Sequence, residues 1–242
     1  MSAPRLAAAI ALACVAGCGP MIVSGEDVSD AASAGDAVAT DGAAITSDGA
    51  LPDGRVVRGP YATRVVSFDP GQGAGFGQDR MPDVVLGPPV GAGDAMGGTD
   101  VVSLGRFGHI CLAFDDVAIV DGPGTDFIVF ENAFYAAGMS TLWDELGEVS
   151  VSDDGVTYHT FACTQQGPPY TGCAGWNPVY SRPGGIAADD VIHAGGDDFD
   201  LADVGITRAR FVCIRDLGTQ SLAPPTTGFD LDAIAAVNHA AP

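Results

Sequence analysis

Apolar residues recur at every second position in several short segments of the chain. In residues 109–114 (HICLAF), the side chains of Ile110, Leu112 and Phe114 fall on one face of an extended backbone. A period of two is the pattern of a β-strand with one buried face. Further segments of strand character are 147–161, 208–216 and 228–238.

Residues 147–161 (GEVSVSDDGVTYHTF) predict a hairpin, because Asp154 and Gly155 can supply the positive φ of a tight turn. Over the whole chain, the pattern predicts roughly eight to ten strands separated by turn signals. The sequence has no βαβ alternation and no long amphipathic helix. We therefore expect an all-β fold, an antiparallel two-sheet sandwich of the jelly-roll kind.

The segment 127–130 (FIVF) is apolar on both faces of its predicted strand, and Glu131 and Asn132 follow it directly. A carboxylate at the end of a buried strand needs a cation, backbone donors or a ligand. Two interpretations are open: an arginine such as Arg210 or Arg215 satisfies Glu131, or a metal ion does.

Composition supports short strands joined by turns. The chain has 242 residues, enough for one good core, with 34 glycines and 16 prolines. Of its 31 acidic residues 27 are Asp, all 10 basic residues are Arg, and the formal net charge is −21. This charge repels phosphate backbones, so no nucleic-acid partner is expected.

The N-terminus has the features of a secretory leader. Arg5 precedes an apolar run too short to span a membrane, and the run ends in Val15-Ala16-Gly17-Cys18. This ending resembles the bacterial lipobox, whose cysteine is diacylated and becomes the mature N-terminus. An ordinary signal peptide is the alternative.

We therefore predict three segments: a lipoprotein signal peptide at 1–17, a lipid-anchored acidic flexible linker at 18–60, and a β-sandwich domain at 61–242. The lipid on Cys18 would make a membrane the protein's partner without any transmembrane helix. The expected location is the cell envelope, at the outer membrane or the cell surface.

Several motifs occur in order between about Phe68 and Asn238: GQGAGFGQDRMPDVVLGPP, GGTDVVSLG, IVDGPGTDFIVFENAF, VSVSDDGVTYHTF, GGDDFDLADVG and GFDLDAIAAVN. Their succession resembles a family of bacterial cell-surface proteins, described as lipoproteins or as secreted proteins with a C-terminal sorting signal. The resemblance implies a secreted β-sandwich similar to discoidin-like and carbohydrate-binding modules. It implies no particular ligand.

The sequence contains no motif of a common enzyme class. GxSxG, HExxH, P-loop and Rossmann signatures are absent, and the histidines stand singly at 109, 159, 193 and 239. Glu131 with an aspartate could form a glycosidase-like pair, but spacing along the chain does not show their separation in space. We expect a protein that is not an enzyme.

Closely spaced acidic residues suggest calcium as a structural cofactor, because loops rich in Asp supply hard oxygen ligands. The sequence GGDDFDLADVG holds several, and Asp230 and Asp232 share one face of a later strand, where they repel unless neutralised. The candidate ligands are Asp126, Glu131, Asn132, Asp197, Asp198 and Asp200. We expect several of them to meet in one polar corner at the end of the strand 127–130. The alternative is that they are ordinary turn, cap and surface residues.

Aromatic residues in predicted loops are candidates for ligand binding: Trp143, Tyr170, Trp176 and Tyr180. An exposed, coplanar pair would favour a glycan site, whereas the same residues could instead pack a long loop onto the sandwich. The leading hypotheses are a binding module for a glycan or another surface ligand and a purely structural or adhesion domain. A glycan-acting hydrolase ranks third.

Four cysteines remain after the leader is removed, which allows three pairings in an oxidising compartment. Cys163 and Cys173 bracket a short loop, whereas Cys111 and Cys213 both lie in the middle of predicted strands. We predict the disulfides Cys163–Cys173 and Cys111–Cys213.

Overall fold

The computed structural model describes residues 59–136 and 140–242. The predicted leader, Cys18 and the linker up to residue 58 lie outside the described residues. Within the described ranges, regular structure consists of short strands in antiparallel sheets and three brief 3-10 turns, which confirms the all-β prediction. No helix in this part of the chain is long and apolar enough to cross a membrane.

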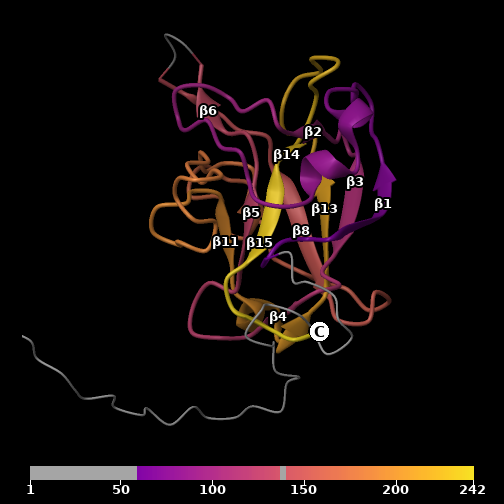
Figure 1. Cartoon of the computed structure of the whole chain (residues 1–242). Helices are drawn as coiled ribbons and strands as arrows, with labels where there is room; N and C mark the ends of the chain where they lie inside the picture. The colour runs from indigo at the N-terminus through magenta and orange to yellow at the C-terminus, as the bar shows by residue number, and fades with distance from the viewer. Residues whose placement is uncertain (1–58, 137–139) are drawn as a thin grey trace, which may run out of the picture. The chain divides into compact units, whose positions relative to one another are not determined.

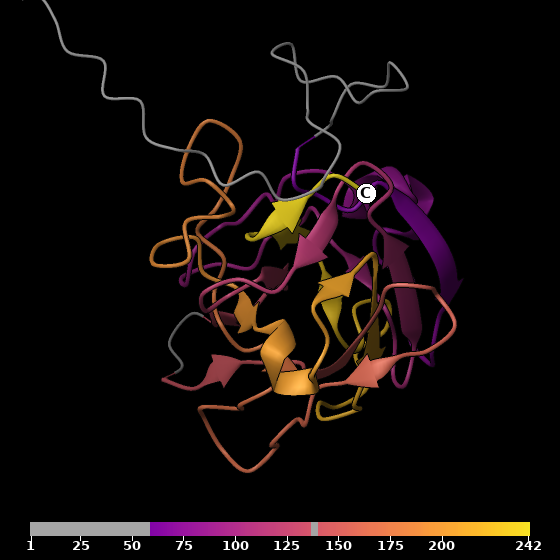
Figure 2. The same cartoon turned by 90° about the horizontal axis from the view of Figure 1, so that it is seen from below.

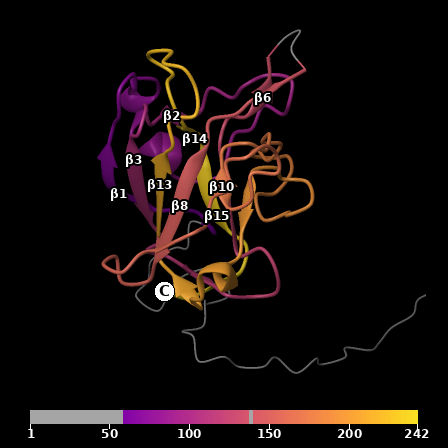
Figure 3. The ribbon, with the colours of Figure 1, turned by 180° about the vertical axis from the view of Figure 1, so that it is seen from behind.

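The larger sheet has six strands, in the order β1, β3, β13, β8 and β10, with β9 also paired to β8. Figures 1 and 3 show β1, β3, β13 and β8 lying side by side. Their bounds are β1 (Arg64–Asp69), β3 (His109–Ala113), β13 (Phe211–Asp216), β8 (Gly147–Ser152), β10 (Cys173–Ala174) and β9 (His159–Thr160).

Alternation along these strands gives the sheet one face of apolar side chains that is completely buried. The inward residues of the central strands have no exposed surface: Ile110, Leu112, Val149, Val151, Val212 and Ile214. The predicted hairpin is confirmed, because β8 pairs with β9 and Gly155 adopts a φ of 73° between them. Asp154 closes the turn by accepting from the backbone N–H groups of Val156 and Thr157, each at 2.8 Å.

A second sheet packs against that buried face and explains why residues 127–130 are apolar on both sides. It consists of β11 (Asp197–Phe199), β5 (Phe127–Phe130) and β15 (Ala233–Ala236), with β5 in the centre. Phe127 and Val129 join the core shared with the larger sheet. Ile128 and Phe130 pack on the other side against loop residues that include Val179 and Ala194. The central strand β5 is therefore covered on both of its faces.

Three smaller sheets complete the fold. The strands β12, β4 and β16 lie together at the lower end in Figure 1 and face the viewer in Figure 2, whereas β6 lies at the upper end. The bounds are β12 (Arg208–Ala209), β4 (Ala118–Val120), β16 (His239–Ala240), β14 (Asp230–Leu231), β2 (Val102–Ser103), β6 (Phe134–Tyr135) and β7 (Leu142–Trp143). The 3-10 turns are η1 (Gln78–Arg80), η2 (Asp83–Val85) and η3 (Leu201–Val204).

Both predicted disulfides are present. Cys111 on β3 lies directly opposite Cys213 on β13, with a Cα–Cα distance of 4.0 Å. The bond between Cys163 and Cys173 closes the short loop before β10, with a Cα–Cα distance of 4.6 Å. The first bond ties two central strands together and the second fixes a segment with little regular structure.

Candidate functional site

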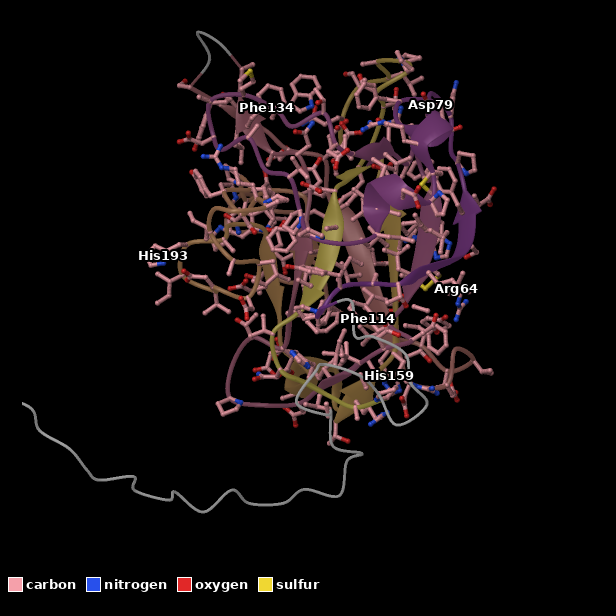
Figure 4. The ribbon with its side chains drawn as sticks, viewed as in Figure 1. Arg64, Asp79, Phe114, Phe134, His159 and His193 are labelled. Carbon is pink, nitrogen blue, oxygen red and sulfur yellow. A yellow bond between two sulfur atoms is a disulfide. The ribbon has the colours of Figure 1, made fainter. Side chains whose placement is uncertain are left out.

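The hairpin β6–β7 forms one wall of a surface cleft, which is called the main cleft below. Phe134 pairs with Trp143 and Tyr135 pairs with Leu142, so alternation puts the two pairs on opposite faces of the hairpin. Phe134 lies at the upper end of the molecule in Figure 4, far from His159 at the lower end. The cleft measures about 570 Å³, and its apolar lining includes Phe76, Met96, Phe134 and Trp143.

Polar groups line the same cleft beside the aromatic wall: Asn132, Glu145 and Asp230. Glu145 accepts a hydrogen bond from the backbone N–H of Gly228 at 3.0 Å and another from the Trp143 side chain. Burial, with a smaller contribution from the nearby Asp230 carboxylate, raises the pKa of Glu145 to about 8. Glu145 therefore carries a proton at neutral pH and can both donate and accept hydrogen bonds.

Asp230 links the cleft to the strands beneath it. It accepts hydrogen bonds from the hydroxyl of Ser103 on β2 and, at 3.5 Å, from the amide of Asn132. Burial raises the pKa of Asp230 to about 6. Its two oxygens are thus held by partners from different elements, which fixes the carboxyl group at the cleft.

Glu131 lies behind this cleft and is only 3% exposed. Its Oε1 accepts from the backbone N–H of Asp230 at 3.3 Å, while its Oε2 is buried and has no hydrogen-bond partner among the described residues. Burial, reinforced by the carboxylates of Asp230 and Glu145, raises the pKa of Glu131 well above its ordinary value. The surroundings of Glu131 therefore disfavour its charged form.

The arginine interpretation of Glu131 is wrong for both candidates. Arg215 pairs with Glu148, its cross-strand neighbour, at 3.0 Å. Arg210 instead pairs with Asp153 at 3.1 Å. Both arginines are engaged in exposed ion pairs, so neither neutralises the buried carboxyl group.

The six predicted calcium ligands do not meet in one corner. Asp126 precedes β5 and Glu131 and Asn132 follow it, so the length of the strand separates them. Because β11 runs antiparallel to β5, Asp200 comes back beside Asp126 at the lower end of the strand. There, single carboxylate oxygens of Asp121, Asp126 and Asp200 lie within 4.8 Å of one another.

Asp197 and Asp198 lie in different environments because their side chains point to opposite faces of β11. Asp198 is exposed, whereas Asp197 is 2% exposed. Asp197 accepts from the backbone N–H groups of Gly175 and Trp176, at 2.6 and 3.2 Å, and from the Asn177 side chain at 3.0 Å. Asp197 therefore anchors the loop after β10 to the second sheet.

The four predicted aromatic residues fall in three places. Trp143 lines the main cleft, while Tyr170 and Trp176 line a second groove of about 400 Å³ on the Tyr135 side of the hairpin. The rings of Tyr170 and Trp176 meet edge to face, 6.0 Å apart at 77°, so they form no flat platform. Tyr180 is exposed and hydrogen-bonds to Asp94.

Sequence reasoning missed Phe134, Glu145 and the role of Asp230 in the cleft. One signal was available: Glu145 is one of only four glutamates and follows Trp143 by two residues. The sequence between Phe134 and Trp143 contains no tight-turn signature, so the pattern of apolar residues could not predict that the two residues pair.

Comparison with family models found no match for this chain. Comparison with curated proteins also found no match.

Proposed function

We propose that the chain is a lipid-anchored cell-envelope protein, held through Cys18 at the outer membrane or cell surface, which presents a jelly-roll sandwich as a calcium-stabilised glycan-binding module. The proposal of glycan binding is supported by the lining of the main cleft. Two aromatic residues, Phe134 and Trp143, lie there beside three polar residues, Asn132, Glu145 and Asp230.

This lining matches the chemistry of a neutral sugar. The C–H faces of a sugar ring pack on aromatic rings, and its hydroxyl groups need hydrogen-bond acceptors and donors at fixed positions. The carboxyl groups of Glu145 and Asp230 and the amide of Asn132 supply them. The absence of basic residues among these lining groups disfavours an anionic ligand.

A purely structural or adhesion domain is the second candidate. The observation that favours it is the edge-to-face packing of Tyr170 on Trp176, which fits two rings that hold a loop in place. In that case the hairpin β6–β7 would serve only to cover the end of the sandwich.

A glycan array probed with the mature protein, followed by calorimetric titration of any glycan found, separates these candidates. We expect binding that Trp143→Ala weakens by about tenfold or more. Trp176→Ala is the matched control, because Trp176 lines the other groove, and it should change affinity by less than about twofold. A negative array, with the protein folded and calcium present, would favour the structural role.

The titrated glycan should also be recovered intact. Glu145 and Asp230 are two carboxyl groups in one cleft, the minimum that glycoside hydrolysis requires. Release of reducing ends by wild-type protein, lost in a folded Glu145→Gln variant, would show that the protein is an enzyme.

A further inference from the structure

The second groove, of about 400 Å³, lies on the Tyr135 side of the hairpin β6–β7. The hairpin residues Tyr135 and Leu142 line it together with Tyr170 and Trp176, which come from the chain before and after β10. Three of these four residues are aromatic. A space of this size is in the range of small-ligand sites, so the second groove can hold a ligand of its own.

The aromatic residues of the second groove remain accessible. Tyr135 is exposed, and Tyr170 and Trp176 are half-buried. The rings of Tyr170 and Trp176 have centroids 6.0 Å apart and planes at 77° to each other. Two rings set nearly at right angles form a corner, which suits a rounded group better than a flat sugar ring. Because the face of an aromatic ring is electrostatically negative, such a corner attracts a cation.

Asp144 adds a carboxyl group to the lining that is not paired with a basic residue in the described structure. Its hydrogen-bond donors are neutral: the side-chain amide of Gln220, at 3.1 Å, and the side chain of Tyr170. Among the described residues that line the second groove, none is basic. The aromatic rings and the carboxyl group therefore favour the same kind of ligand, one with a positive charge.

We propose that the second groove binds a small alkylated ammonium ion such as choline, with Tyr170 and Trp176 as its aromatic contacts and Asp144 as its counter-charge. A quaternary ammonium group carries its charge on a rounded, apolar surface, which aromatic rings recognise. A metal ion is disfavoured because the lining offers a single carboxyl group and no histidine or cysteine. The same group in a lipid headgroup is disfavoured, because the lining has no basic residue to bind the phosphate.

This ammonium site is separate from the glycan site proposed above, so either can exist without the other. The formal net charge of −21 attracts cations to the whole protein surface. The experiment must therefore distinguish binding in the second groove from this general attraction.

Choline chloride is titrated into the mature protein by calorimetry at constant ionic strength. We expect one choline per chain, with a Kd of about 1 mM or tighter. The neutral isostere of choline, in which carbon replaces the nitrogen, has the same shape without the charge and should bind at least about tenfold more weakly. Glycerophosphocholine, a soluble form of the lipid headgroup, should also bind at least about tenfold more weakly. Equal affinity for glycerophosphocholine would overturn the assignment to a free ion and point to the lipid headgroup.

Variants locate the bound ion. Trp176→Leu keeps an apolar side chain and removes the ring, so choline binding should weaken at least about tenfold. Asp144→Asn keeps the side-chain shape and removes the charge, which should weaken binding about fivefold; it tests the groove independently if Trp176→Leu fails to fold. The matched control is Asp198→Asn, which removes a charge from an exposed position outside the groove and should change affinity by less than about twofold.

Two further results would overturn the proposal. One is that millimolar choline produces neither heat nor a change in tryptophan fluorescence with folded wild-type protein. The other is an equal loss of affinity in Asp144→Asn and Asp198→Asn, which would show general charge attraction only. Choline binding together with a negative glycan array would leave this site standing and remove the glycan function, and glycan binding without choline binding would do the reverse.

Discussion

Phe134 and Trp143 lie directly opposite each other on the hairpin β6–β7, and both line the cleft beside Glu145. Residues directly opposite each other on paired strands have neighbouring Cβ atoms, so the pairing of β6 with β7 brings both side chains to the same wall of the cleft. The strand pairing that forms the hairpin therefore also places the two aromatic residues at the ligand surface.

Phe134→Ala should consequently expose Trp143 to water. In a Trp176→Phe background, where Trp143 is the only tryptophan, we expect its fluorescence emission to shift to longer wavelength. Tyr135→Ala is the matched control, because Tyr135 points to the other face of the hairpin and should leave the emission in place. An equal shift in both variants would mean that the whole hairpin has detached.

Glu145 should make the protein less stable as the pH rises. Its pKa is about 8 in the folded protein against an ordinary value of 4.5, so the folded state holds the proton more tightly than the unfolded state does. The stability from this protonation is fully present below about pH 4.5 and is lost as the pH rises to about 8. The neighbouring carboxylates of Asp230 and Asp216 contribute to this pKa, after burial itself.

The measurement is the free energy of unfolding in urea between pH 5 and 9, with chelator present. Glu145 contributes a decline of at most about 1.4 kcal/mol per pH unit. Glu145→Gln should flatten the profile without abolishing the slope, because the pKa of Asp197 is also raised, to about 7. A wild-type profile that rises across this range would contradict the assignment.

The two disulfides should differ in their contribution to stability. Cys111–Cys213 closes a sequence separation of 102 residues and Cys163–Cys173 one of 10. Loop-closure entropy gives about 4.7 kcal/mol for the first and about 2.7 kcal/mol for the second. Replacing each pair by serine and comparing urea denaturation should therefore cost more for Cys111–Cys213. An equal loss would show that native packing, not chain entropy, sets the effect.

The sequence could predict the parts of the fold that depend on local pattern. Alternation in β3 and β8, the Asp154-Gly155 turn and both disulfides follow from spacing and residue type. The apolar residues on both faces of β5 also indicated a covered strand, although the second cover is a loop rather than a sheet.

The candidate site was much less predictable, because it depends on which strand ends meet. Asp126 and Glu131 are close in sequence, yet β5 holds them at opposite ends, whereas Glu131 and Asp230 are 99 residues apart and hydrogen-bonded. Pairing between distant segments is set by the packing of the whole core, which no local pattern encodes. For the same reason, the sequence could not predict that Trp143 and Asp230 line one cleft.

Asp197 should be a stability residue, distinct from its exposed neighbour Asp198. Asp197→Ala would leave the backbone N–H groups of Gly175 and Trp176 without their acceptor in a buried place, at a cost of about 2 to 4 kcal/mol. Urea denaturation measures this cost, and hydrogen exchange at the Gly175 and Trp176 amides should accelerate. Asp198→Ala, one residue away on the exposed face of β11, should change the free energy of unfolding by less than about 0.5 kcal/mol. An equal loss of unfolding free energy in the two variants would mean that the removal of a negative charge, and not the loss of the hydrogen bonds to Gly175 and Trp176, causes the effect.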